Sequence, residues 1–224
     1  MLKKKFRSLF KYLLHRFHPL IKRSDLPYAT HIPIIVGIST IWRVRKVLEL
    51  GGGNFSTYTF MDRTIFPEIE ELITIEDNPE WGKYLESSLN KDNRFKLVYD
   101  IGNFAVSISE LDLSKFDLIF IDNSTSSDTR SETIKIISEK NIGDAVLVIH
   151  DFEQKKYQIA SNNLPYRYMF DALNPATGLI WANYNKVDYG NLKKINKIIS
   201  NSNNKVDLIN MVDWKNLFEA AFRK

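Results

Sequence analysis

Short apolar runs alternate with helix-like patterns along the middle of the chain. Runs rich in Val, Ile, Leu and Phe predict five strands, at Val47–Leu50, Leu72–Ile75, Phe95–Tyr99, Leu118–Ile121 and Ala145–Ile149. Between and before them, the apolar spacing predicts helices at Ile34–Trp42, Thr57–Arg63, Pro79–Leu89, Ser131–Lys140 and Glu153–Ser161. This alternation predicts an α/β fold whose parallel sheet has right-handed crossovers.

The pattern changes after the fifth predicted strand. Two strand-like runs, Tyr166–Leu173 and Gly178–Tyr184, flank a Pro-containing turn and predict an antiparallel hairpin. Residues 185–224 predict a helical extension that ends in an apolar-periodic helix around Met211–Phe222. This extension would either cap the site of residues 24–184 or form the contact of a homodimer.

The first 23 residues form a separate basic segment. They hold eight Lys or Arg and no acid, so the segment carries +8 and residues 24–224 carry −4 of the +4 net charge. Apolar residues at three- and four-residue steps predict an amphipathic helix, which either binds an anionic membrane surface or docks on its own domain. Because the body is mildly acidic, we expect no nucleic-acid partner.

Composition excludes several classes of chemistry and suggests a compartment. The chain has no cysteine, which excludes disulfides, thiolate zinc sites and cysteine nucleophiles. No run approaches the ~18 apolar residues of a membrane span. A signal-peptide core of ~7–15 apolar residues is also missing. We therefore expect a cytoplasmic location, with peripheral membrane association if residues 1–23 bind lipid.

The turn after the first predicted strand is the strongest candidate for a ligand site. Glu49 lies near the end of the run Val47–Leu50 and the cluster Gly51-Gly52-Gly53 follows that run, while Glu76 ends the second strand. Glycines let the backbone approach a ligand closely, and an acid at the end of a second strand accepts hydrogen bonds from ribose hydroxyls. This layout predicts a nucleotide-type pocket at the carboxyl edge of the sheet.

The glycine spacing distinguishes between nucleotide-like ligands. A dinucleotide fingerprint needs G-x-G-x-x-G, but Ser56 stands at the third position. The order Glu-x-Gly-x-Gly at 49–53 instead resembles motif I of class I S-adenosylmethionine-dependent methyltransferases, although Phe55 replaces a frequent third glycine. The resemblance covers most of residues 44–184. It implies a Rossmann-like three-layer α/β/α sandwich whose seven-stranded sheet is mostly parallel, with an antiparallel C-terminal hairpin.

The same resemblance implies the residues that would bind S-adenosylmethionine. Glu76 would bind the ribose, and Asp100, after the third strand, would contact the adenine. The full implied set is Glu49, Gly51, Gly52, Gly53, Asn54, Ser56, Glu76, Asp77, Asp100, Ile101 and Asp122.

The ends of the fourth and fifth strands resemble a branch of this superfamily that methylates hydroxyls of small molecules and sugars. Asp122 and the pair His150-Asp151 would be catalytic, with His150 or Asp122 as general base. The alternative for His150 is a structural hydrogen bond. Some members of the branch use a divalent metal, which would place Mg²⁺ on Asp122 and Asp151. Asn123-Ser124-Thr125 stands where the branch commonly has a histidine, which argues against the metal.

Three further polar residues have two interpretations each. His31 lies in a connector, where a surface histidine is favoured over one at the mouth of the site. Arg130 and Asp128 either contact substrate from the loop 123–130 or belong to the start of a helix.

Together these patterns predict a methyltransferase acting on a small-molecule or sugar hydroxyl. A binding protein of the same fold that has lost catalysis is the first alternative, and a nicotinamide-dependent oxidoreductase is the second.

Overall fold

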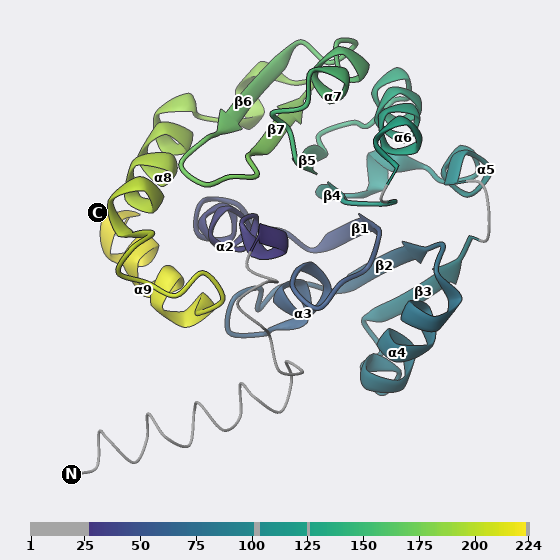
Figure 1. The fold of residues 1–224 in the computed structure, drawn as a ribbon, viewed down its shortest axis with the longest axis horizontal. Coiled ribbons are helices and arrows are strands. Elements are labelled where there is room, and N and C mark those ends of the chain that lie inside the picture. The colour runs from purple at the N-terminus through teal and green to yellow at the C-terminus, as the bar shows by residue number, and fades with distance from the viewer. Residues whose placement is uncertain (1–26, 101–103, 125, 223–224) are drawn as a thin grey trace.

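One sheet organises the computed structural model, which describes residues 27–100, 104–124 and 126–222 (Figure 1). Its seven strands run in the order β3-β2-β1-β4-β5-β7-β6. They are β1 (Lys46–Leu50), β2 (Glu71–Glu76), β3 (Phe95–Tyr99), β4 (Leu118–Ile121), β5 (Val146–His150), β6 (Tyr166–Phe170) and β7 (Thr177–Trp181). The first five pair in parallel, and β7 pairs antiparallel with both β5 and β6. The mostly parallel sheet with a C-terminal hairpin is confirmed.

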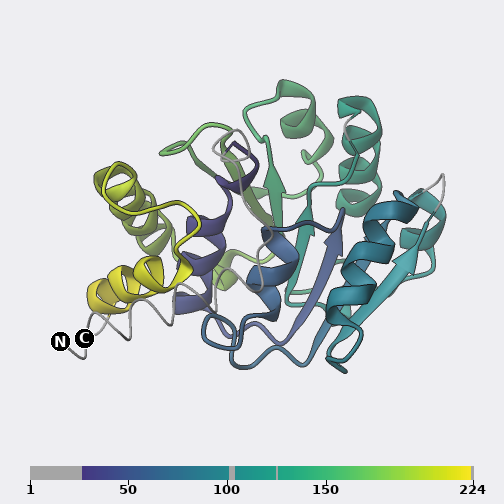
Figure 2. The same ribbon diagram turned by 60° about the horizontal axis from the view of Figure 1, so that its bottom comes forward.

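Helices cover both faces of this sheet, which gives the expected three layers (Figures 1 and 2). On one face lie α2 (Ile32–Ile41), α3 (Ser56–Met61), α4 (Pro79–Leu89), α8 (Tyr189–Ser202) and α9 (Met211–Phe222). On the other face lie α5 (Phe104–Ser109), α6 (Ser127–Glu139) and α7 (Lys155–Ala160). Short 3₁₀ segments include η2 (Leu113–Lys115) and η3 (Tyr184–Lys186), and residues 27–29 have the same conformation.

The hydrophobic core has two parts, one on each face of the sheet. Successive strand residues point to opposite faces, so Val47 joins one part while Leu48 and Leu50 join the other. Every residue of β4 and β5 is buried, as expected for strands covered on both faces. The central strands are therefore held rigidly, and their carboxyl ends are fixed relative to one another.

The C-terminal extension shares the core of the central domain. Helix α9 packs against α2, and Trp214 and Phe218 are fully buried there. A Cβ atom added to Gly37 of α2 would lie 2.9 Å from Ile195 of α8, which shows how closely these two helices approach. Helix α8 lies within the predicted helical extension 185–224, although no bounds were predicted for it; its apolar residues recur at helical spacing and are buried.

Helix boundaries differ from the expectation where capping decides them. Helix α6 begins at Ser127, four residues before the predicted start, because the side chain of Ser126 accepts a hydrogen bond from the Thr129 amide. Helix α4 matches the prediction residue for residue, with the side chain of Asn78 as its cap. The basic segment 1–23 lies outside the described residues. Among the residues described, no helix has both the length and the apolar character to cross a membrane.

Candidate functional site

A cavity opens where the strand order reverses between β1 and β4. In open α/β sheets this is the point at which ligands bind, outside the carboxyl ends of the strands. The cavity has a volume of about 660 Å³, within the range of small-molecule sites. From β1 and β2 it is lined by Gly51, Gly52, Glu76 and Asp77, and from the β4 and β5 side by Asp122, Arg130, His150 and Asp151. The described lining residues run no further than Pro175, so α8 and α9 do not cap the cavity.

The glycine turn is built to touch both neighbouring strands. Gly51 has φ +82°, and a Cβ atom placed on it would lie 2.6 Å from the carbonyl oxygen of Asp122. Its amide donates to the carbonyl of Ile75 at 2.9 Å. Only glycine meets both requirements, because a side chain disfavours this conformation and would collide with backbone atoms.

The carboxylate of Glu76 holds the turn from the second strand. Its Oε2 accepts the amide of Gly52 at 2.8 Å, and its Oε1 accepts the amide of Asn78 at 2.9 Å. Burial raises the pKa of Glu76, and these two amide bonds oppose that effect. A carboxylate has about four lone-pair sites, so two remain for the hydroxyls of a ligand in the cavity.

Glu49 supports the glycine turn from behind and does not line the cavity. It is fully buried, and its Oε2 accepts the hydroxyls of Thr57 and Thr74, each at 2.7 Å. Thr57 in turn accepts the amide of Gly53 at 2.9 Å. Burial raises the pKa of Glu49 to about 7, against the effect of its hydroxyl partners. Glu49 thus influences a ligand in the cavity only by holding the glycine turn in place.

The other predicted cofactor residues have different placements. Gly53, Asn54, Ser56 and Asp100 do not contribute to the described lining of the cavity, and Ile101 lies outside the described residues. Trp81, which we did not anticipate, does line it and donates from its indole nitrogen to the carbonyl of Gly52 at 2.6 Å. Its position in the first turn of the helix after Glu76 is the signal that could have identified it.

The three predicted catalytic residues do meet at one place. Nδ1 of His150 lies 3.4 Å from Oδ2 of Asp122 and 3.6 Å from Oδ1 of Asp151. Burial is the largest single influence on both groups and disfavours a charge on either Asp122 or His150, but the attraction between them and to their charged neighbours together outweighs it. The pKa of Asp122 is therefore lowered and the pKa of His150 is raised. This corner of the cavity holds an ion pair.

Arg130 joins the two acids. The sequence left open whether this residue contacts substrate or belongs to the start of a helix. It lies in α6 with its side chain buried, 2.9 Å from Oδ1 of Asp122 and 2.7 Å from Oδ2 of Asp151. It also donates to the carbonyls of Asn123 and Ser124. Asp128, by contrast, has a 92% exposed side chain and pairs with Lys156.

This arrangement does not fit Mg²⁺ between Asp122 and Asp151. A guanidinium already occupies one oxygen of each carboxylate, and a second cation there would meet its positive charge at close range. The sequence expectation of this metal site is not supported.

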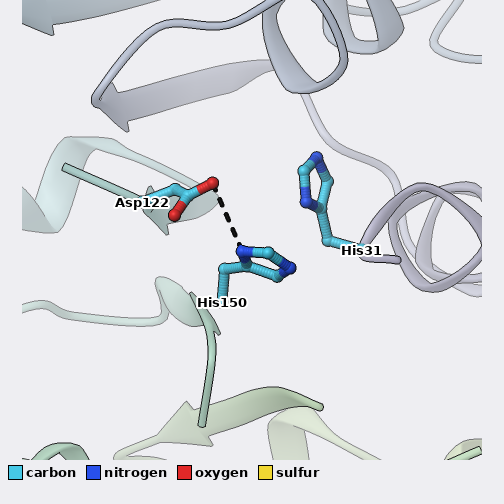
Figure 3. Close-up of side chains that lie close together, drawn as sticks. All are labelled: His31, Asp122 and His150. Carbon is cyan, nitrogen blue, oxygen red and sulfur yellow. Dashed lines mark ion pairs between the residues drawn. The ribbon is translucent and has the colours of Figure 1, made fainter. Parts of the chain in front are cut away.

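His31 is buried, and the expectation of a surface histidine is wrong. It comes immediately before α2 and is 1% exposed, with its ring centroid 4.9 Å from that of His150 (Figure 3). Burial, and then the nearby His150, lower the pKa of His31 to about 3, so it is neutral. On the other side of His150, Nε2 lies 3.0 Å from the hydroxyl of Thr30.

Two residues of the cavity have strained backbone. Asp151, directly after β5, has φ +58°, and Ser124, in the loop after β4, has φ +60°. Residues other than glycine adopt this conformation rarely, at a cost of about 1–3 kcal/mol, and they cluster at functional sites. In Asp151 this conformation accompanies the contact of its carboxylate with Arg130.

Comparison with known proteins gives a match at the level of structure. No protein-family model and no curated protein matches the chain. Among solved structures, a putative caffeoyl-CoA O-methyltransferase from Staphylococcus aureus matches with TM-score 0.51 and 14% identity, over 79% of this chain and 91% of that one. Human methyltransferase-like protein 13 in complex with SAH matches with TM-score 0.51 and 12% identity, over 82% and 94%.

A third solved structure matches the chain to the same extent. An SAH-bound methyltransferase from Podospora anserina matches with TM-score 0.51 and 12% identity, over 80% of this chain and 96% of that one. The sheet order, the glycine turn and these matches agree. The chain has the fold of the class I S-adenosylmethionine-dependent methyltransferases.

Proposed function

We propose that the protein is an S-adenosylmethionine-dependent methyltransferase that transfers the methyl group to a hydroxyl of a small molecule or sugar. The observation that carries the proposal is the cavity at the strand reversal, because it joins two complementary halves. One half is a glycine turn hydrogen-bonded to the acid Glu76. The other is the cluster of Asp122, His150 and Asp151. The first suits a nucleoside, and the second suits a polar acceptor.

Methyl transfer asks little covalent chemistry of the protein. The acceptor oxygen attacks the methyl carbon in line, the carbon–sulfur bond breaks, and S-adenosylhomocysteine and a proton are released. The protein supplies positioning, exclusion of water and a base for that proton. Solved structures of the same fold contain SAH, the demethylated product, which supports this cofactor.

Asp122 is the proton acceptor that the geometry favours over His150. Both ring nitrogens of His150 face partners, namely Thr30 at Nε2 and the two acids at Nδ1. The Asp122 side chain is 23% exposed and lines the cavity, so a substrate hydroxyl reaches it directly. His150 would then stabilise the charge of Asp122 and set its orientation.

A binding protein without catalytic activity is a second candidate. The buried Arg130 favours it, since this guanidinium occupies an oxygen of both acids that a reacting hydroxyl would use. Such a protein would bind the cofactor and its product without turning them over.

The test combines product binding with turnover on a panel of hydroxylated acceptors. The full-length protein is incubated with S-adenosylmethionine and each acceptor, and formation of S-adenosylhomocysteine is measured. Asp122→Asn is compared with the matched variant Asp128→Asn, whose carboxylate is exposed and outside the cavity lining. We expect turnover to be lost only in the first. Product binding without turnover on any acceptor supports the inactive protein, and no binding contradicts both.

A further inference from the structure

The starting observation is a buried histidine whose ring nitrogens have no partner. His31 is 1% exposed, and neither Nδ1 nor Nε2 makes a hydrogen bond. A neutral imidazole has one donor and one acceptor, and leaving both unsatisfied in the interior is unfavourable. Figure 3 shows the ring facing the pair formed by Asp122 and His150. An unsatisfied group in this position indicates that something else completes the site.

The two oxygens of Asp122 have different surroundings. Oδ1 is bound by Arg130 at 2.9 Å, whereas Oδ2 faces Nδ1 of His150 at 3.4 Å. The second distance is longer than a charge-assisted hydrogen bond, which is about 2.7–2.9 Å. This distance leaves room for an ion that binds both Nδ1 of His150 and Oδ2 of Asp122.

The far side of His150 determines what Nδ1 offers. The Thr30 hydroxyl donates to the carbonyl of Pro175 at 2.9 Å, so its oxygen accepts from Nε2 of His150 at 3.0 Å. Nε2 therefore carries a proton. The ion pair described above has a second proton on Nδ1, and when that proton is absent the lone pair of Nδ1 points toward the carboxylate of Asp122. Two electron-rich atoms in this arrangement require a positive charge between them. A proton would leave His31 unsatisfied, whereas a metal ion would engage all three side chains.

We propose that His31, Asp122 and His150 bind a divalent first-row transition metal, with Zn²⁺ as the reference ion. One donor atom from each residue lies within 4.8 Å of the other two. Tetrahedral Zn²⁺ with bonds of about 2.1 Å has ligand atoms about 3.4 Å apart. Nδ1 of His150 and Oδ2 of Asp122 already have this separation. Two imidazoles and one carboxylate suit Zn²⁺, Mn²⁺, Fe²⁺ or Co²⁺, whereas Mg²⁺ prefers oxygen ligands.

The surroundings of the three ligands match those of metal sites. Metal-bound histidines donate their other ring nitrogen to a polar partner, as His150 does to Thr30, and metal-bound carboxylates are themselves hydrogen-bonded, as Asp122 is to Arg130. Three protein ligands leave one position open for water or a ligand oxygen. The site does not use Asp151. Since Arg130 and the metal would hold both oxygens of Asp122, the role of Asp122 as proton acceptor belongs to the metal-free protein.

The test is a calorimetric titration of metal-free, full-length protein with Zn²⁺. The chain has four histidines and no cysteine, so His15→Gln and His18→Gln together leave His31 and His150 as the only imidazoles. In this background we expect one Zn²⁺ per chain, and unchanged binding in the presence of excess Mg²⁺. Co²⁺ should give the visible absorption of a tetrahedral site. His31→Phe should abolish both signals, and Thr30→Val should weaken Zn²⁺ binding about 10- to 100-fold.

Two controls make the outcome decisive. Circular dichroism and thermal unfolding without metal establish that each variant is folded, and His31→Asn replaces His31→Phe if the larger ring does not fit. Binding of S-adenosylhomocysteine is measured separately, so failure of the proposed function leaves this test intact. Absence of stoichiometric Zn²⁺ binding, or equal binding in a folded His31 variant, would overturn the proposal.

Discussion

The amide of Gly52 donates to Oε2 of Glu76 at 2.8 Å, and this contact joins the turn after β1 to the end of β2. Two features that lie 24 residues apart in the chain thereby form one wall of the cavity. The glycine turn supplies backbone that a ligand can approach, and the acid supplies acceptors for its hydroxyls.

Replacing Glu76 with Gln tests this wall. The amide nitrogen of Gln cannot accept a hydrogen bond, so the variant leaves either Gly52 or Asn78 facing a donor. It also removes the negative charge that would hold ribose hydroxyls. Hydrogen bonds to charged groups contribute about 1.5–3 kcal/mol. We therefore expect S-adenosylhomocysteine to bind about 10- to 100-fold more weakly in calorimetry. Unchanged affinity would show that Glu76 does not contribute to binding this ligand.

Two glycines of the turn should respond differently to alanine. Gly51→Ala places a Cβ 2.6 Å from backbone at Asp122 and forces alanine to φ +82°, at a cost of about 1–2 kcal/mol for the dihedral alone. A Cβ on Gly53 meets nothing nearer than 3.8 Å. We expect Gly51→Ala to lower the melting temperature and prevent product binding, while Gly53→Ala resembles wild type. Equal behaviour of the two variants would contradict this account of the turn.

Arg130 should be important for stability because it neutralises two partly buried acids. Arg130→Met leaves Asp122 and Asp151 without their guanidinium partner, and breaking a buried pair in this way costs about 3–5 kcal/mol. Denaturant unfolding measures the loss. The matched control is Lys156→Met in α7, which removes a partner of the exposed Asp128 and should change stability little. A similar effect of the two substitutions would show that the Arg130 network is not a stabilising element.

His31 predicts a specific dependence of stability on pH. Its pKa is about 3 in the folded protein and near 6.5 when unfolded, so between these values only the unfolded chain binds the proton. Stability therefore falls as the pH is lowered from 6.5 toward 3, with a slope that approaches about 1.4 kcal/mol per pH unit. His31→Phe removes this component and should flatten the profile. Measurements in the presence of a chelator separate this effect from metal binding. A His31→Phe profile as steep as that of wild type would show that His31 does not cause the loss of stability at low pH.

The sheet and the glycine turn could be predicted because they are encoded locally. The bounds of β3, β4 and α4 match the apolar runs residue for residue. Gly51 and Glu76 lie at strand ends, and parallel strands bring their carboxyl ends to one edge whatever the rest of the chain does. The order of the motifs was therefore sufficient to bring together Gly51, Glu76, Asp122 and His150.

Residues whose role depends on contacts between distant elements could not be predicted. Thr30 and His150 are 120 residues apart, and their contact exists only because α2 begins beside the end of β5. His31 was assigned to the surface for the same reason, since its connector gives no sign of what will cover it. Arg130 has the sequence context of an ordinary helix start, and its buried contacts with two acids appear only after α6 packs beside β4 and β5.

One calorimetric titration tests the central claim most directly. S-adenosylhomocysteine is added to the full-length protein, and NADH is added in a parallel experiment. We expect one product molecule to bind per chain with a Kd on the order of micromolar, which corresponds to about −8 kcal/mol, and no binding of NADH. Binding of NADH without binding of S-adenosylhomocysteine would contradict the methyltransferase assignment, while leaving the fold unchanged.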